Sequence, residues 1–323
     1  ELTSVTNEVF DEAMKKAKLG DKEAQFALGE MYQYAKGILQ DYEAAMDWYL
    51  KAARQGHAEA QNAIGFMHHH EQGVSQDYAA AMDWYTEAAA QGLATAQYNV
   101  GHMFDKGIGV SQDYSAAMDW YLKAASQGHA GAQNAIGFMY QHGRGVPQDY
   151  AEAMDWYMKA AVQGYTAAQY NIGFLYHHGH GVPHDYSAAM DWYLKAADNG
   201  YAVAFNNIGS LHYHGLGVPH DYSAAMDWYL EAANYGYVRA FINIGSLYYN
   251  GLGVPQSDSL AMDWYRKAAD RGVSAAQYNL GLMFETGRGV PKDMAAAKEW
   301  YRKAADQGLT DAKEGIDRLE RQS

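Results

Sequence analysis

Aspartate, tryptophan and tyrosine lie close together in the segment DYSAAMDWYLKAA, at residues 113–125. Carboxylates beside aromatic rings could form a catalytic pair or a platform for sugar binding. The same segment returns at residues 185–197, and again at 221–233 with Glu231 in place of lysine. A catalytic site is needed once, so this recurrence favours a structural role for these aspartates and aromatic residues.

Histidines form groups that could bind a metal ion. The groups are His68, His69 and His70; His177, His178, His180 and His184; and His212, His214 and His220. One position of successive repeats is occupied by His142, His178 and His214, which are 36 residues apart. Packed helices lie about 10 Å apart, so these imidazoles are too far from one another to share an ion readily. We expect no metal site and no cofactor. The histidines are interpreted as polar helix ends, whose imidazolium forms suit the negative end of the helix dipole.

Tryptophan recurs every 36 residues, from Trp48 to Trp300, and this series accounts for all 8 tryptophans. A fixed period of about 20–50 residues is typical of repeat proteins, whose units stack on their neighbours. The spacing predicts eight full repeats over residues 21–308, with polar half repeats at 1–20 and 309–323 that would cap a complete array. The predicted repeats are 21–56, 57–92, 93–128, 129–164, 165–200, 201–236, 237–272 and 273–308.

Each repeat is predicted to be a pair of helices, as residues 129–164 illustrate. In the first half, Ala132, Ile136 and Met139 recur at the spacing of one helix face. The second half carries a similar apolar stripe, formed by Tyr150, Ala153, Met154, Tyr157, Ala160 and Ala161. The sequence therefore predicts an all-α fold of helix–turn–helix repeats.

Turn and cap residues separate the two helices. Gly143 permits the positive φ angle of a tight loop, although Ala35 and Glu71 stand at this position in early repeats. Asp149 is placed to accept hydrogen bonds from the free N–H groups that begin the second helix. Gly164 suits a left-handed residue after that helix.

The second aspartate of the repeated segment is interpreted as a surface residue that pairs with a lysine four positions further on. An acidic residue before lysine at this spacing stabilises a helix by about 0.2–0.5 kcal/mol. The predicted pairs are Asp47–Lys51, Asp119–Lys123, Asp155–Lys159, Asp191–Lys195 and Asp263–Lys267, with Glu299–Lys303 as the variant.

Charge and composition argue against several classes of partner. The net charge is -14, with 38 acidic and 24 basic residues, whereas phosphate contacts need clustered lysine and arginine. Nucleic acid is therefore not expected as a partner. The chain lacks cysteine, and it has no apolar run long enough to span a membrane. The sequence begins ELTSVTNEVF, which contains no apolar secretory core. We therefore expect a soluble protein, and the sequence does not decide between a cytoplasmic and an exported location.

The repeated motifs resemble those of the Sel-one-like repeat (SLR) family, a branch of the tetratricopeptide superfamily. The resemblance rests on QYNLGL at 277–282, GRGVPQDY, AMDWYxKAA and the QG that ends most repeats. It implies a right-handed alpha-alpha superhelix, a solenoid of about eight 36-residue repeats, that acts as a non-catalytic scaffold or adaptor. Some bacterial relatives have disulfide-bridged repeats and affinity for β-lactams, but this chain has no cysteine and matches that branch poorly. The alternative is a hydrolytic enzyme with a site not visible in the sequence, such as a β-lactamase-like relative of the family.

When the repeats are aligned, each position forms a column of equivalent residues. The columns whose residues differ between repeats are the candidates for partner binding. In this superfamily the third, sixth, tenth and thirteenth positions of each repeat line the concave groove. Aromatic residues, asparagine and histidine mingle there, and these types suit contacts with a peptide. The alternative is that the rings only fill space between helices. The candidate residues are Tyr98, His102, Asn134, Phe138, Tyr170, Phe174, His177, Asn206, Tyr213 and Tyr249.

Two further expectations concern this groove. An asparagine column, exemplified by Asn207 and Asn243, is expected to bond a neighbouring backbone or to reach a bound peptide. Acidic residues, including Asp105, outweigh the single charge of Arg239, so a neutral or basic protein or peptide is expected as the partner. The sequence indicates neither the identity of this partner nor the oligomeric state.

Overall fold

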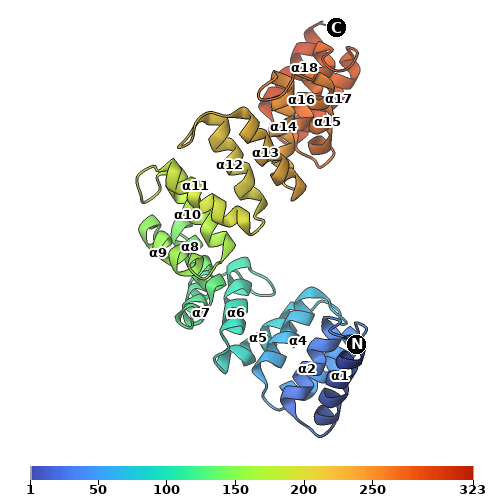
Figure 1. The fold of residues 1–323 in the computed structure, drawn as a ribbon, viewed down its shortest axis with the longest axis vertical. Coiled ribbons are helices and arrows are strands. Elements are labelled where there is room, and N and C mark those ends of the chain that lie inside the picture. The colour runs from blue at the N-terminus through green and yellow to red at the C-terminus, as the bar shows by residue number, and fades with distance from the viewer. Residues whose placement is uncertain (1, 323) are drawn as a thin grey trace. The chain divides into compact units, whose positions relative to one another are not determined.

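The computed structural model describes residues 2–322, with side chains from 8 to 321. Within these residues it contains 18 helices and no strand, which confirms the all-α prediction (Figure 1). Residues 1 and 323, the outermost positions of the two predicted caps, lie outside the described residues.

First and second helices alternate along the chain. The first helices are α2 (Lys22–Gln33), α4 (Ala58–His70), α6 (Ala94–Lys106), α8 (Ala130–His142), α10 (Thr166–His178), α12 (Ala202–His214), α14 (Val238–Asn250) and α16 (Ser274–Thr286). The second helices are α3 (Tyr42–Ala53), α5 (Tyr78–Ala90), α7 (Tyr114–Ser126), α9 (Tyr150–Ala161), α11 (Tyr186–Asp198), α13 (Tyr222–Asn234), α15 (Asp258–Ala269) and α17 (Met294–Asp306). The series is flanked by α1 (Leu2–Lys18) and α18 (Thr310–Gln322).

The chain divides into two compact units, Glu1–Tyr165 with α1 to α9 and Thr166–Ser323 with α10 to α18. Inside each unit, every helix packs against the helices that precede and follow it along the chain. The contact is most extensive between the two helices of one repeat. Each repeat therefore completes its core by stacking on a neighbour, as expected of a repeat protein.

Short polar side chains begin the second helices, as predicted. The carboxylate of Asp149 accepts hydrogen bonds from the backbone N–H groups of Ala151 and Glu152 at 2.9 and 3.1 Å. Ser257 has the same role at α15. Most first helices begin differently, although Asp21 caps α2 in the same way. At α8 a ring nitrogen of His129 accepts from a backbone N–H, whereas the caps of α12, α14 and α16 make no side-chain hydrogen bond.

The loops between the helices depend on left-handed residues. Gly143, which follows α8, has a φ of 64°, and Gly164 after α9 has a φ of 83°. Ala35 and Glu71 adopt the same region with φ values of 53° and 57°, although a side chain is disfavoured there. Both early loops thus keep the shared geometry without the glycine that suits it.

A buried tyrosine opposite a glycine forms the centre of each repeat. Tyr157 is fully buried, and a Cβ atom added to Gly137 on the first helix would lie 2.6 Å from its ring. Gly65 and Tyr85, and Gly245 and Tyr265, repeat this relation at 2.7 Å. The glycine column of the first helix is therefore explained by the space that the tyrosine ring occupies.

The predicted pairing of aspartate with lysine on the second helices is mostly wrong. Of the six predicted pairs, the described residues form only the ion pair between Lys303 and Glu299, at 3.4 Å. The lysines lie instead over the tryptophan three positions earlier, and the Nζ atom of Lys159 is 3.7 Å from the ring centre of Trp156. A half-buried indole offers the ammonium group an attractive face while the lysine stem covers apolar surface.

Candidate functional site

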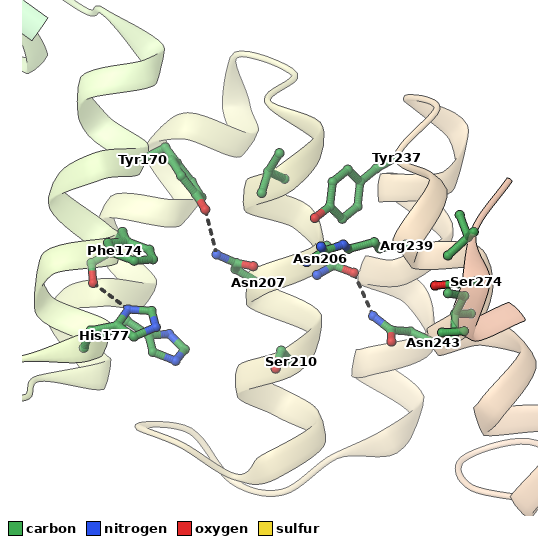
Figure 2. Close-up of a pocket in the computed structure, with 15 residues that line it drawn as sticks. Tyr170, Phe174, His177, Asn206, Asn207, Ser210, Tyr237, Arg239, Asn243 and Ser274 are labelled. Carbon is green, nitrogen blue, oxygen red and sulfur yellow. Dashed lines mark hydrogen bonds between the residues drawn. The ribbon is translucent and has the colours of Figure 1, made fainter. Parts of the chain in front are cut away.

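All ten candidate residues lie on first helices and are half-buried, so each is both packed and accessible. In the second unit, Tyr170, Phe174, His177 and Asn206 line one pocket of about 630 Å³. The pocket also contains side chains that were not among the candidates (Figure 2). They are His178, Val203, Asn207, Ser210, Tyr237, Arg239, Ile242, Asn243, Val273, Ser274 and Ala275.

Tyr170 forms one wall of this pocket and is held by packing on both sides. Its ring centre lies 5.6 Å from that of Tyr193 in α11 and 5.1 Å from that of Tyr201. Its hydroxyl accepts a hydrogen bond from Asn207 Nδ2 at 3.4 Å, and burial raises its pKa. The ring is thus fixed in place before any partner binds, which reduces the entropy lost on binding.

Phe174 and the histidines at the end of α10 form the next part of the wall. The Phe174 ring lies 4.0 Å from the imidazole of His178, which also contacts the carbonyl of Phe174 through Nδ1 at 3.0 Å. His177 packs at 5.4 Å against Tyr186. Burial lowers the pKa of His177 to about 4, so it is a neutral imidazole at pH 7 and not the imidazolium that the sequence suggested.

Asparagines connect successive first helices across the floor of the pocket. Asn243 donates from Nδ2 to Asn206 Oδ1 at 2.8 Å, and Asn207 donates to Tyr170 (Figure 2). In the first unit, Asn99 donates to Asn62 in the same way, at 2.9 Å. The expected bonds to a neighbouring backbone are therefore wrong at these positions, because the partners are side chains of the preceding repeat.

The charge of the pocket comes from Arg239, on the first turn of α14. The Arg239 side chain is exposed, and none of the residues that line the pocket is a carboxylate. Asp105, the acidic residue that the sequence suggested for this groove, is buried and lies 2.6 Å from Lys106 Nζ. The local charge at the pocket is thus positive, although the whole chain is acidic.

The remaining candidates lie elsewhere. Tyr98 and His102 line a cavity of about 180 Å³ in the first unit. Phe138 and Asn134 lie on α8, where the guanidinium of Arg144 covers the Phe138 ring at 4.8 Å.

Two candidates of the second unit, Tyr213 and Tyr249, do not line the main pocket. Tyr213 lines a cavity of about 280 Å³, which shares four lining residues with the main pocket: Asn206, Asn207, Ser210 and Asn243. The guanidinium of Arg288 lies 3.5 Å from the ring centre of Tyr249, which reduces the access of a partner to that ring. The structure thus brings four of the ten candidates together and places a fifth beside them.

Sequence reasoning missed Tyr237 because it followed four positions of each repeat and the asparagine column, which already contains Asn243. Tyr237 lies at the first position, where the N-terminal end of a first helix faces the pocket, and Asn243 lies at the seventh. The available signal was their side-chain type. Tyrosine stands at the first position in three successive repeats, as Tyr165, Tyr201 and Tyr237, where the others have aspartate, histidine, leucine or valine, and asparagine recurs in its column.

Metal-ligating side chains form no candidate metal site in the described part of the chain. Within residues 8–321, no three His, Asp or Glu side chains are arranged to hold a metal ion. Several histidines instead pack against aromatic rings, as His142 does against Phe138 at 4.2 Å. The arrangement can offer aromatic surface, amide groups and one guanidinium, which are the groups of a binding surface.

Comparison with known proteins identifies the repeats. The Sel1 repeat matches eight times, over residues 22–57, 58–93, 94–129, 130–165, 166–201, 202–237, 240–273 and 274–309. A search of curated proteins found no match.

Solved structures are similar over nearly the whole chain. A protective antigen of uropathogenic Escherichia coli with an SLR fold is 35% identical, with a TM-score of 0.79 over 95% of this chain and 66% of that chain. This chain therefore spans just under two thirds of the length of that antigen. A Sel1 repeat protein from Oxalobacter formigenes is 31% identical, with a TM-score of 0.73 over 96% and 90% of the two chains. Yeast Tom70 is 13% identical, with a TM-score of 0.51 over 93% of this chain and 63% of Tom70, and this similarity concerns the fold alone. The chain belongs to the Sel1 repeat family.

Proposed function

We propose that this chain is a non-catalytic scaffold or adaptor that binds a segment of a partner protein in the pocket of the second unit. Sel1 repeat solenoids are typical of protein-interaction scaffolds, and the family is generally non-enzymatic. The observation that carries the proposal is the pocket itself, where pre-packed aromatic rings, paired asparagines and one free guanidinium face a common space (Figure 2). Rigid aromatic side chains beside adaptable polar groups are common anchors in protein interfaces.

The lining of the pocket refines the expected chemistry of the partner. Arg239 is the only lysine or arginine in the lining, and no carboxylate lines the pocket. A neutral segment suits this lining, and an acidic side chain would gain a charge-assisted hydrogen bond from the guanidinium. For this pocket we therefore propose a neutral or acidic segment, in place of the neutral or basic one that the acidity of the whole chain suggested.

The test starts with affinity capture and mass spectrometry to identify the partner, followed by affinity measurements on variants. Arg239→Glu should weaken binding at least tenfold, because it removes one charge-assisted bond and adds repulsion. Tyr170→Ala with Phe174→Ser should weaken it by about thirtyfold, as for loss of a 2 kcal/mol hot spot. Arg302→Glu, on the exposed face of α17, is the matched charge control.

Thermal unfolding separates binding from folding. Arg239→Glu changes an exposed side chain and should leave the unfolding midpoint within a few degrees of the wild type. If Arg239→Glu and the double variant both keep their affinity within twofold, the pocket is not the binding site. If the double variant unfolds and Arg239→Glu binds normally, the rings only pack the repeats.

A further inference from the structure

The tryptophan rings of the second helices divide into two classes by what covers them. Six carry a lysine three positions later whose Nζ atom lies over the ring, at 3.7 to 4.1 Å from its centre. These rings are Trp48, Trp120, Trp156, Trp192, Trp264 and Trp300. The chain thus builds the same ammonium–indole contact repeatedly from its own residues.

Trp84 and Trp228 are the exceptions. Glu87 and Glu231 take the place of the lysine, and neither α5 nor α13 contains a lysine or arginine. Among the described residues, no cationic group lies over either of these two rings. At α13 the exchange is isolated, because residues 221–233 otherwise equal 113–125 and 185–197.

The packing around Trp228 leaves room for the missing ammonium group. Phe205 stacks against the indole at 6.0 Å. Trp264 has an equivalent neighbour, Phe241, at 5.7 Å, and nevertheless carries Lys267 Nζ at 3.8 Å. A phenylalanine beside the indole is therefore compatible with a cation over the same ring. The Trp228 ring is itself partly exposed.

The charge at Trp228 also favours a cation. Asp227 and Glu231 are both exposed and lie one helical turn apart on α13, before and after Trp228 in the sequence. The Glu231 side chain has no hydrogen bond or ion pair within the described residues. At Trp84, in contrast, Glu87 already accepts a hydrogen bond from Gln61 at 3.0 Å. Trp228 is thus the better of the two positions for an external ligand.

We propose that Trp228, with Glu231 and Asp227, is a docking point for a lysine side chain of a partner protein. The partner's ammonium group takes the position that the chain's own lysines occupy in six other repeats. Glu231 supplies a carboxylate that those repeats lack, whereas an acidic residue at the Asp227 position is common to all of them. An indole face and a carboxylate together select an alkylammonium group over a neutral side chain. This surface lies on the second helices and is distinct from the pocket on the first helices.

The proposal is tested by following the indole N–H signals of the full chain by NMR while an N-acetylated, C-amidated tri-lysine peptide is added. Trp228→Phe assigns the signal. The Trp228 signal should shift saturably and by more than that of Trp192, whose ring is covered by Lys195. The same peptide acetylated at its three side-chain amines has lost its charge and should give no such shift.

Two variants that exchange lysine and glutamate provide matched controls, because each gives its helix a sequence that already occurs elsewhere in the chain. Glu231→Lys makes residues 221–233 identical to 185–197 and should reduce the Trp228 shift to that of the covered rings. Lys195→Glu makes 185–197 identical to the natural 221–233 and should make Trp192 respond. Glu231→Gln, which adds no lysine, should weaken the peptide at Trp228 about threefold, as for loss of an exposed ion pair.

Three outcomes would overturn the proposal. The first is a Trp228 shift no larger than that of the covered rings. The second is an unchanged Trp228 response in Glu231→Lys. The third is an equal response to the side-chain-acetylated peptide, which would show that the ammonium charge is not recognised.

Discussion

At the scale of the single residue, His177 shows how a possible metal ligand becomes part of the packing. Its ring lies against Tyr186 and Tyr193, and its Nδ1 atom is buried without a hydrogen-bond partner in the described structure. Burial is the main cause of its lowered pKa, and His178, His184 and His214 lower it further. A proton on this ring would have no compensating group nearby, so protonation opposes folding.

We predict that His177 makes the stability of the chain sensitive to mild acid. Its pKa falls from 6.5 to about 4 on folding, so the unfolded chain binds more protons between these values. This contribution to stability is present at pH 7 and is lost as the pH falls toward 4. In denaturant unfolding at several pH values, His177→Gln should lose less stability between pH 7 and pH 4 than the wild type. His220→Gln, at an exposed histidine, should follow the wild type, and identical slopes for all three proteins would contradict the prediction.

At the scale of the helix, the sequence predicts what depends on neighbouring residues in the chain. The cap at Asp149 and the apolar stripe through Ala153 and Tyr157 follow from local spacing, and the structure confirms them. The expected ion pair of Asp155 with Lys159 depended on the same spacing and is wrong. The lysine has a second neighbour within reach, the Trp156 ring, and spacing alone cannot say which of the two attracts it more.

The end of α4 gives a prediction for stability. Glu71 occupies the left-handed position that glycine fills at Gly107 and Gly143 in the following repeats. The left-handed region costs a residue with a side chain about 1–2 kcal/mol, and glycine's greater freedom in the unfolded chain offsets part of this. Glu71→Gly should therefore raise the free energy of unfolding by about 0.5–1 kcal/mol in chemical denaturation.

The reverse exchange is its control. Gly107→Ala should lower stability, because the φ of 65° is retained and the added Cβ would lie 3.2 Å from Gln112. Loss of stability in Glu71→Gly would mean that the Glu71 side chain contributes more to α4 than its backbone angle costs.

At the scale of the whole chain, the 36-residue period predicts the repeat fold but not the binding pocket. The period can be recognised from the amino-acid sequence alone, because every repeat carries its tryptophan and tyrosine at fixed positions. The pocket of the second unit combines side chains of four first helices, α10, α12, α14 and α16, at different positions within their repeats. Tyr237 enters it through the stacking of those helices. The asparagine column contains Asn243 but does not show that this residue bonds Asn206 across the pocket.

Repeat architecture also predicts that damage stays local. A repeat contacts mainly its neighbours, so stability is close to a sum over repeats and their interfaces. In Gly65→Val, the new side chain would overlap the buried ring of Tyr85, where a Cβ atom alone already comes within 2.7 Å. Such overpacking costs typically about 1–3 kcal/mol. Hydrogen exchange measured by mass spectrometry should then show faster exchange in α4, α5 and adjacent helices, with unchanged protection across residues 166–322. Gly245→Val, which meets Tyr265 at the same distance in the second unit, should give the opposite pattern. If either variant lowers protection equally in both units, the chain unfolds as one cooperative body and the additive description of the repeats fails.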